Sequence, residues 1–158
     1  MKLLNPYTRY PEYNCFGCAP NNPVGLKMEF ELRNNAIHSN WTPSSDFQGF
    51  YQILHGGIVA AAIDEIASWA MQVLCKTSGF TSEIQIKYLK PVYIEKSPLK
   101  LEARVESIQE KHAIIQVQLW DNEHTLCSTA KVDYYLFSEE LARSTFYYPG
   151  VDSFFEQD

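Results

Sequence analysis

The residue types best able to do chemistry in this chain lie together between His55 and Glu65. Two glycines, Gly56 and Gly57, follow the histidine, and the carboxylates Asp64 and Glu65 come about two helical turns later. Unpaired backbone N–H groups gather at the start of a helix, and glycines let a ligand approach them closely. Soluble proteins rarely bury Asp or Glu without a partner. The pattern therefore indicates an active site that combines backbone donors with an acid.

The residues around this motif predict one long helix from Gly56 to roughly Cys75. Most of them are small or apolar, and Asp64, Glu65 and Gln72 interrupt the run. A helix that is apolar on almost every side is surrounded by protein, so we expect this helix to be buried. At 1.5 Å per residue, Gly56 and Asp64 are expected roughly 12 Å apart along it.

Segments on both sides of the helix alternate between apolar and polar residues, which is typical of strands. The expected strands are 26–33, 36–41, 81–90, 98–109, 112–121 and 125–137, with a hairpin turn at Asn34-Asn35. Ser138 is expected to cap a short helix that begins at Glu139. Strands, one long helix and a further run of antiparallel strands predict an α+β fold in which one antiparallel sheet wraps the buried helix.

With 158 residues, 46% of them hydrophobic, the chain is expected to form one globular domain. Residues 1–25 contain four prolines and are expected to form an N-terminal arm of loops and short turns. Residues 26–137 hold the sheet and the long helix. Residues 138–158 are expected to form the short helix and a loose acidic tail.

The charge of the chain excludes some partners. A net charge of -6 and a pI near 5.2 argue against nucleic acid. No uninterrupted apolar stretch of about 18 residues occurs, and the first residues do not resemble a signal peptide, so we expect no membrane association. A cytoplasmic location is the simplest prediction.

The sequence also contains a C-x-x-C pair, Cys15 and Cys18. Its spacing suits zinc ligands or a redox pair, but a tetrahedral zinc site needs further ligands and no second C-x-x-C is present. A redox pair normally lies between a strand and a helix, whereas this one lies in a Pro- and Asn-rich segment. We expect a structural turn, with a metal site and redox activity as the alternatives.

Three segments, in their order and spacing along the chain, resemble the hotdog-fold acyl-CoA thioesterases, and in particular the phenylacetyl-CoA thioesterase-like branch. The His-Gly-Gly motif with Asp64 nine positions after His55 is one; the others are Asn22-Pro23-Val24-Gly25-Leu26 and residues 81–91, TSEIQIKYLKP. The resemblance implies the hotdog fold and hydrolysis of an acyl-CoA or aroyl-CoA thioester. It also implies that no metal or other cofactor is needed, and that the chain forms a homodimer or homotetramer with sites shared between subunits.

The resemblance and the helix geometry together assign the two central roles. In the family, a backbone N–H that corresponds to that of Gly56 polarises the thioester oxygen, and Asp64 is the expected nucleophile or general base. These two groups are too far apart to serve one carbonyl, so both act only if a second, antiparallel helix supplies one of them. Glu65 points about 100° away around the helix and is expected to make a structural hydrogen bond, with the catalytic role of Asp64 as its alternative.

Other residues are expected to support the site. His55 is expected to cap or orient the glycine turn, with substrate contact or base catalysis as alternatives. In one family branch an Asn near the thioester carbonyl falls at the position of Gly49, and Gln48 is the candidate to replace it. Thr81 corresponds to a Ser or Thr that helps hold the attacking water in relatives. We count Asp64, Gly56, Thr81, Gln48 and His55 as candidate catalytic residues, and Gly57, Glu65, Phe47 and Gly49 as candidate substrate-binding residues.

Two other functions compete with hydrolysis. A hotdog hydratase would pair a His with the acid, but the Asp-x-x-x-x-His pattern typical of hydratases is missing. A non-catalytic protein that binds acyl-CoA or another small ligand on the same scaffold is the alternative from another class. Asp64 argues against it, because a binder has no need for a buried acid.

Overall fold

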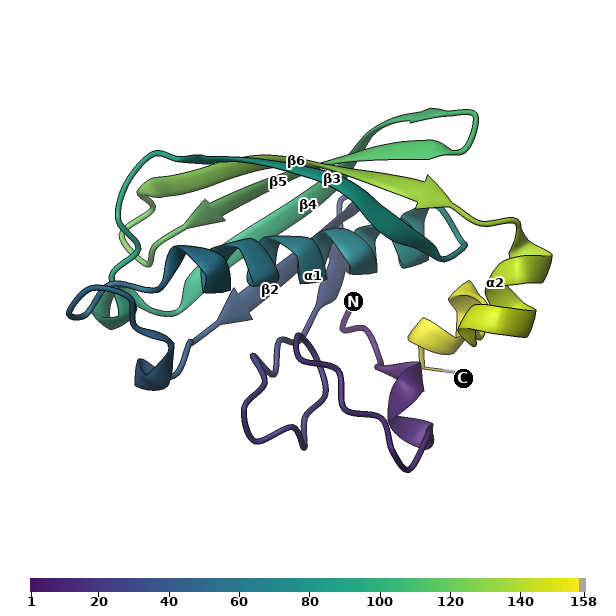
Figure 1. The fold of residues 1–158 in the computed structure, drawn as a ribbon, viewed down its shortest axis with the longest axis horizontal. Coiled ribbons are helices and arrows are strands. Elements are labelled where there is room, and N and C mark those ends of the chain that lie inside the picture. Colours follow the sequence, from purple (N-terminus) through teal and green to yellow (C-terminus); the bar gives the residue numbers. More distant parts are fainter. Residues whose placement is uncertain (157–158) are drawn as a thin grey trace.

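The computed structural model describes residues 1–156, which form one curved antiparallel sheet and two α-helices (Figure 1). The strands are β1 (Glu31–Arg33), β2 (Ala36–Trp41), β3 (Gly79–Tyr88), β4 (Leu99–Gln109), β5 (His112–Trp120) and β6 (Leu126–Leu136). The helices are α1 (Gly56–Leu74) and α2 (Glu139–Phe146), and four short 3-10 helices occupy Pro6–Arg9, Ser45–Phe47, Ile94–Lys96 and Val151–Phe154. The strand order is β1-β2-β4-β5-β6-β3, so β3 forms one edge of the sheet.

Helix α1 lies along one face of the sheet, as Figure 1 shows, and packs mainly against β4 and β5. By length and composition alone it could cross a membrane, but 56% of its most apolar window is buried inside the protein. Its buried side chains are Val59, Ala62, Ile63, Ile66, Ala67, Trp69, Ala70, Met71 and Val73. The expectation of a helix buried on all sides is only partly met, because Gly56 and Gly57 are exposed and Asp64 and Ser68 are half-buried.

The alternation of residues 26–33 predicted a strand that is mostly absent. Strand β1 holds only Glu31–Arg33, while the segment before it packs against the N-terminal arm. Lys27 has a φ of 54°, which breaks the extended conformation. The N–H groups of Leu26 and Met28 donate to the carbonyl oxygens of Phe16 and Gly17 instead of a strand. The alternation of residues 26–33 therefore reflects the burial of one side of the segment, and most of the segment does not pair in the sheet.

The other expected elements form close to their predicted positions. Asn34 and Asn35 have φ values of 50° and 54°, as a tight hairpin turn requires. Ser138 caps α2 by accepting a hydrogen bond from the N–H of Leu141 at 3.3 Å.

The expectation of a loose C-terminal tail was wrong for the described residues; residues 157–158 lie outside them. Phe154 is fully buried, with its ring 5.4 Å from that of Trp69 on α1 and 6.2 Å from that of Tyr148. The N-terminal arm also packs through aromatics, and the rings of Tyr7 and Tyr13 stack with their centroids 5.8 Å apart. The expectation rested on the acidic residues of the tail and did not take account of Phe154, which packs into the core.

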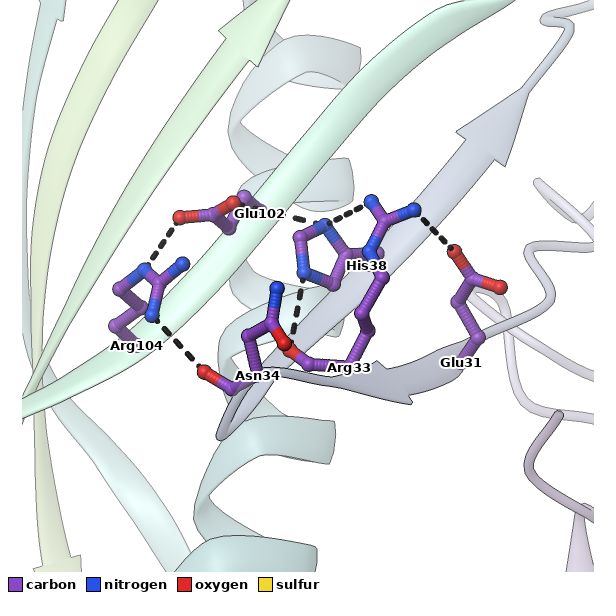
Figure 2. Close-up of polar contacts among 6 residues, drawn as sticks. All are labelled: Glu31, Arg33, Asn34, His38, Glu102 and Arg104. Atoms are coloured by element: carbon purple, nitrogen blue, oxygen red, sulfur yellow. Dashed lines mark hydrogen bonds and ion pairs between the residues drawn. The ribbon is translucent and has the colours of Figure 1, made fainter. Parts of the chain in front are cut away.

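A polar network joins β1, β2 and β4 around His38 (Figure 2). His38 Nδ1 lies 3.2 Å from Arg33 Nη2 and 3.6 Å from a Glu102 carboxylate oxygen, while Nε2 lies 3.3 Å from the Arg33 carbonyl oxygen. The ring therefore accepts from Arg33 at Nδ1 and donates from Nε2, as a neutral imidazole does. Burial, followed by the Arg33 charge, lowers the pKa of His38, although Glu102 acts in the opposite direction.

Candidate active site

Asp64 projects from α1 towards β3 and β6, and its carboxylate is held by one oxygen. The Thr81 hydroxyl on β3 and the Tyr134 hydroxyl on β6 each lie 2.8 Å from Oδ1. Within residues 1–156, Oδ2 accepts no hydrogen bond. Two donors on one oxygen fix the direction of the carboxylate, so the second oxygen stays available to a water or a carbonyl carbon.

Tyr134 is the residue that the sequence did not reveal. It is buried, and it is paired directly with Thr81 in the β3–β6 register, so both hydroxyls reach Asp64 from neighbouring strands. Burial, followed by the charge of Asp64, raises the pKa of Tyr134 and keeps the phenol a neutral donor. Only the strand pairing could have found it, since a Tyr on an alternating strand is typical of a core.

The β3 strand is irregular where it meets this carboxylate. Its register with β6 shifts between Thr81 and Glu83, which marks a β-bulge. Bulges re-aim side chains and are common beside active sites. Thr81 is thus positioned both by the bulge and by its pairing with Tyr134. Its hydrogen bond to Asp64 is consistent with the supporting role expected for it, which stays a prediction.

The two N–H groups of the glycine turn, those of Gly56 and Gly57, differ in their hydrogen bonding. His55 is the N-cap of α1, and its Nδ1 accepts from the Gly57 N–H at 2.9 Å. The Gly56 N–H donates no hydrogen bond to any described residue, while the Gly56 carbonyl oxygen accepts from the Tyr88 hydroxyl at 2.8 Å. His55 therefore caps the turn and leaves the Gly56 donor free for a ligand, at the positive end of the helix dipole.

The loop before α1 is held by its own hydrogen bonds. Gln48 donates from Nε2 to the Ser45 carbonyl oxygen at 3.0 Å and accepts the Gln52 N–H at 2.7 Å, so its amide does not reach Asp64 of the same chain. Gly49 packs closely on His55, because a Cβ at this position would lie 3.2 Å from the His55 Cα. The role of Gln48 at a carbonyl stays a prediction.

Phe47 belongs to the same loop and is half-buried. Its ring meets that of Phe16 edge-to-face at 6.5 Å, and it lines a groove of about 740 Å³ that also includes Trp41 and Val24. The walls of this groove also include charged residues, among them Lys27, Glu29 and Asp46, so they are not specific for an apolar acyl group. The expectation that Phe47 contacts the substrate therefore stays a prediction.

Glu65 faces the N-terminal arm, away from the donors of Asp64. Trp69 Nε1 donates to Glu65 Oε1 at 3.1 Å, as expected for a structural hydrogen bond, and Cys15 Sγ lies 3.7 Å from Oε2. Burial, followed by the neighbouring Cys15, raises the pKa of Glu65 to about 7. These contacts join Glu65 to the arm and to its own helix, and the expectation that Glu65 contacts the substrate stays a prediction.

Strand β3 connects the two parts of the candidate site. It runs beside α1, with Thr81 at one end bonded to Asp64 and Tyr88 at the other end bonded to Gly56. Asp64 and Gly56 thus lie at opposite ends of one ten-residue strand. A single chain cannot bring both groups to one carbonyl carbon, which must lie about 3 Å from its attacking group.

Sequence comparison finds similarity between the central part of this chain and thioesterases. A family model described as the thioesterase superfamily matches residues 51–128, which include the glycine turn, Asp64 and Thr81. A protein of Saccharolobus solfataricus, whose name proposes an esterase, is 33% identical over 88 residues, which cover 55% of this chain. The match covers 57% of that relative's length.

Solved structures with low sequence identity share the fold. The PaaI protein from the phenylacetic acid degradation operon of E. coli has a TM-score of 0.64 at 13% identity, over 72% of this chain and 82% of that one. A hypothetical thioesterase of Streptococcus pneumoniae, solved with coenzyme A, has a TM-score of 0.64 at 17% identity, over 71% and 90%. The chain, with one antiparallel sheet packed on one long helix, has the hotdog fold and is similar to the thioesterase superfamily over residues 51–128.

Proposed function

We propose that this protein hydrolyses acyl-CoA or aroyl-CoA thioesters at sites shared between two copies of the chain. The observation that carries the proposal is the Asp64 carboxylate, fixed at Oδ1 by Thr81 and Tyr134 and free at Oδ2. A half-buried acid with two dedicated donors and one unused oxygen suits a catalytic group better than a structural one.

The reaction consumes one water and yields a carboxylic acid and the free thiol of CoA. Asp64 Oδ2 either removes a proton from the water that attacks the thioester carbon, or attacks that carbon itself to form a mixed anhydride, which water then hydrolyses with release of a proton. Negative charge then develops on the carbonyl oxygen, where the N–H of the partner's Gly56 stabilises it. The C–S bond breaks as the tetrahedral intermediate collapses, and the thiolate takes up the proton. Thr81 and Tyr134 hold Asp64, and His55 preserves the turn that presents the Gly56 N–H.

The free edge of β3 supports the shared site. An exposed edge of ten residues is a ready template for pairing with a second chain. In an antiparallel register with its two-fold axis near the middle of β3, the Thr81 end of one strand lies beside the Tyr88 end of the partner's strand. Asp64 is bonded to Thr81 and Gly56 to Tyr88, so this register brings each Asp64 towards the partner's Gly56. A homodimer is the minimal assembly, and a homotetramer built from such dimers keeps the same sites.

The family and the neighbours support the class of substrate. The family model is a thioesterase model, and the Streptococcus pneumoniae structure carries coenzyme A. A net charge of -6 means that the CoA phosphates are bound by local groups, not by an overall positive field. The cytoplasmic location remains a prediction.

Thiol release from a panel of short, long, branched and aromatic acyl-CoAs tests the proposal. The wild type is expected to release CoA from at least one of them, and Asp64→Asn to lower kcat by about 10²- to 10⁴-fold, the usual contribution of a general base. Asp152→Asn, which changes an exposed acid, is the control and is expected to match the wild type. Binding of acyl-CoA without cleavage by the wild type would instead establish a ligand-binding protein. Equal rates for Asp64→Asn and wild type would refute the role of Asp64.

A further inference from the structure

Three potential metal ligands from distant parts of the sequence meet on the opposite side of α1 from Asp64's donors. Cys15 and Cys18 lie in the N-terminal arm with their sulfurs 3.6 Å apart. Cys15 Sγ lies 3.8 Å and 3.7 Å from the two carboxylate oxygens of Glu65 on α1. One ligand atom from each of the three residues can be chosen so that all lie within 4.8 Å of one another.

We propose that Cys15, Cys18 and Glu65 bind a zinc ion that ties the N-terminal arm to α1. The proposal goes beyond thioester hydrolysis and does not depend on it. The sequence supplied only the C-x-x-C pair, which is too few ligands; the fold supplies the third from a position 50 residues away. Zinc accepts this combination of thiolate and carboxylate ligands.

The two distances from Cys15 Sγ to the other ligand atoms are close to those of a tetrahedral zinc site. With Zn–S bonds of about 2.3 Å and a Zn–O bond of about 2.0 Å, tetrahedral angles place two sulfurs about 3.8 Å apart and a sulfur and an oxygen about 3.5 Å apart. The cluster shows 3.6 Å between sulfurs and 3.7 Å between Cys15 Sγ and Glu65 Oε2. A disulfide would instead need the sulfurs at about 2.05 Å.

The residues around the cluster orient its ligands. A Cβ on Gly17 would lie 2.2 Å from the Glu65 carboxyl carbon, so glycine between the two cysteines lets the carboxylate approach. Trp69 Nε1 donates to Glu65 Oε1 at 3.1 Å, and Asn5 Nδ2 lies 3.5 Å from Cys18 Sγ. Donors of this kind hold ligands in metal sites and neutralise part of their charge.

A water can complete the coordination. A cavity of about 380 Å³ is lined by Asn5, Trp69 and one of the three ligands, Cys18. It offers room for a fourth ligand. Two thiolates and a carboxylate held this closely repel one another, and a divalent cation removes that repulsion. The ion would thereby contribute to the attachment of the arm.

The test uses the full-length protein, purified under reducing conditions and stripped with a chelator. Zinc is titrated against a chromophoric competitor, and cobalt(II) is added separately to report ligand type. We expect one ion per chain, with a thiolate-to-cobalt charge-transfer band and the visible bands of tetrahedral cobalt. Cys15→Ser and Cys18→Ser should lose the charge-transfer intensity, and Glu65→Gln should weaken zinc binding by about 10- to 100-fold. Cys75→Ser and Cys127→Ser, which change thiols outside the cluster, should bind as the wild type does.

Thermal unfolding keeps the test decisive if a variant is unstable. Added zinc should raise the Tm of the wild type and of Cys75→Ser but leave that of Cys18→Ser unchanged. No binding by the reduced wild type, or equal binding by Cys15→Ser and Cys18→Ser, would overturn the site. A wild-type chain that binds no zinc and is isolated two hydrogens lighter, with Cys15 linked to Cys18, would show a disulfide in place of a metal site.

Discussion

The hydroxyl of Tyr134 lies 2.8 Å from Asp64 Oδ1 and 3.0 Å from the carbonyl oxygen of the same residue. Thr81, the direct strand partner of Tyr134, donates to the same carboxylate oxygen at 2.8 Å. The acid on α1 is therefore positioned by a cross-strand pair, and its orientation depends on the register of β3 against β6.

Replacing Tyr134 with Phe should lower kcat without unfolding the protein. The change removes one hydroxyl, and a hydrogen bond to a charged group contributes about 1.5–3 kcal/mol, so a fall of about 10- to 100-fold is expected. KM should change little, because the hydroxyl contacts Asp64 and not the substrate. Steady-state thiol release checks this, with Tyr147→Phe at an exposed position as the control. A wild-type kcat in Tyr134→Phe would show that the contact does not serve catalysis.

Replacing Gly56 with Pro removes the proposed oxyanion donor while keeping the helix start. Proline suits the first helical position, and the φ and ψ of His55, -59° and 133°, suit a residue before proline. Loss of one such donor is expected to lower kcat by about 10²- to 10³-fold. Gly56→Ala keeps the N–H, and its Cβ would meet Tyr88 at an ordinary 3.7 Å, so it should stay near wild type. Equal rates for the two variants would argue against the N–H as a donor.

Mixing two inactive variants tests whether the site is shared. Asp64→Asn and Gly56→Pro, unfolded together and refolded, should form heterodimers in which one of the two sites is intact. Random pairing predicts recovery of about a quarter of the wild-type activity. The rate is measured before and after mixing, with each variant refolded alone as the control. No recovery from a mixture shown to contain heterodimers would mean that both groups act within one chain.

Replacing Phe154 with Ala should destabilise the whole domain, although the residue lies near the C-terminus. Its ring is fully buried against Trp69 and Tyr148, and Phe→Ala in a core costs about 3–5 kcal/mol. Phe50→Ala, which truncates a ring that is 82% exposed, should change the free energy of unfolding by less than about 0.5 kcal/mol. Urea unfolding of both variants checks the contrast. Similar stabilities would mean that the segment Val151–Phe154 is not part of the core in solution.

His38 should make the protein less stable as the pH falls below about 6.5, the ordinary pKa of histidine. Its pKa is lowered in the fold, so the unfolded chain binds a proton that the folded chain does not, and the free energy of unfolding decreases with falling pH. His38→Gln cannot take up this proton and should show a weaker dependence. Urea unfolding between about pH 7.5 and 5.5 measures both slopes. Parallel curves over this whole range would contradict the shift.

Much of the fold follows from local patterns. The helix from Gly56, the Asn34-Asn35 hairpin and the four strands after the helix could all be predicted, because each depends on residues close in sequence. The strand expected at 26–33 could not be judged in this way. Its alternation reflects burial against the arm. Lys27 leaves the extended conformation where Leu26 and Met28, on either side of it, donate hydrogen bonds to the arm.

The sequence by itself determined which groups are present at the candidate site: a histidine cap, a glycine turn and Asp64 on one helix. Only the tertiary structure decided what surrounds them. Tyr134 meets Asp64 across 70 residues, and Glu65 meets Cys15 across 50. These contacts depend on strand register and on the path of the arm, which long-range packing sets and no local spacing encodes. The helix motif therefore supplies the proposed reacting acid, while the sheet orients Asp64 and the arm binds its neighbour Glu65.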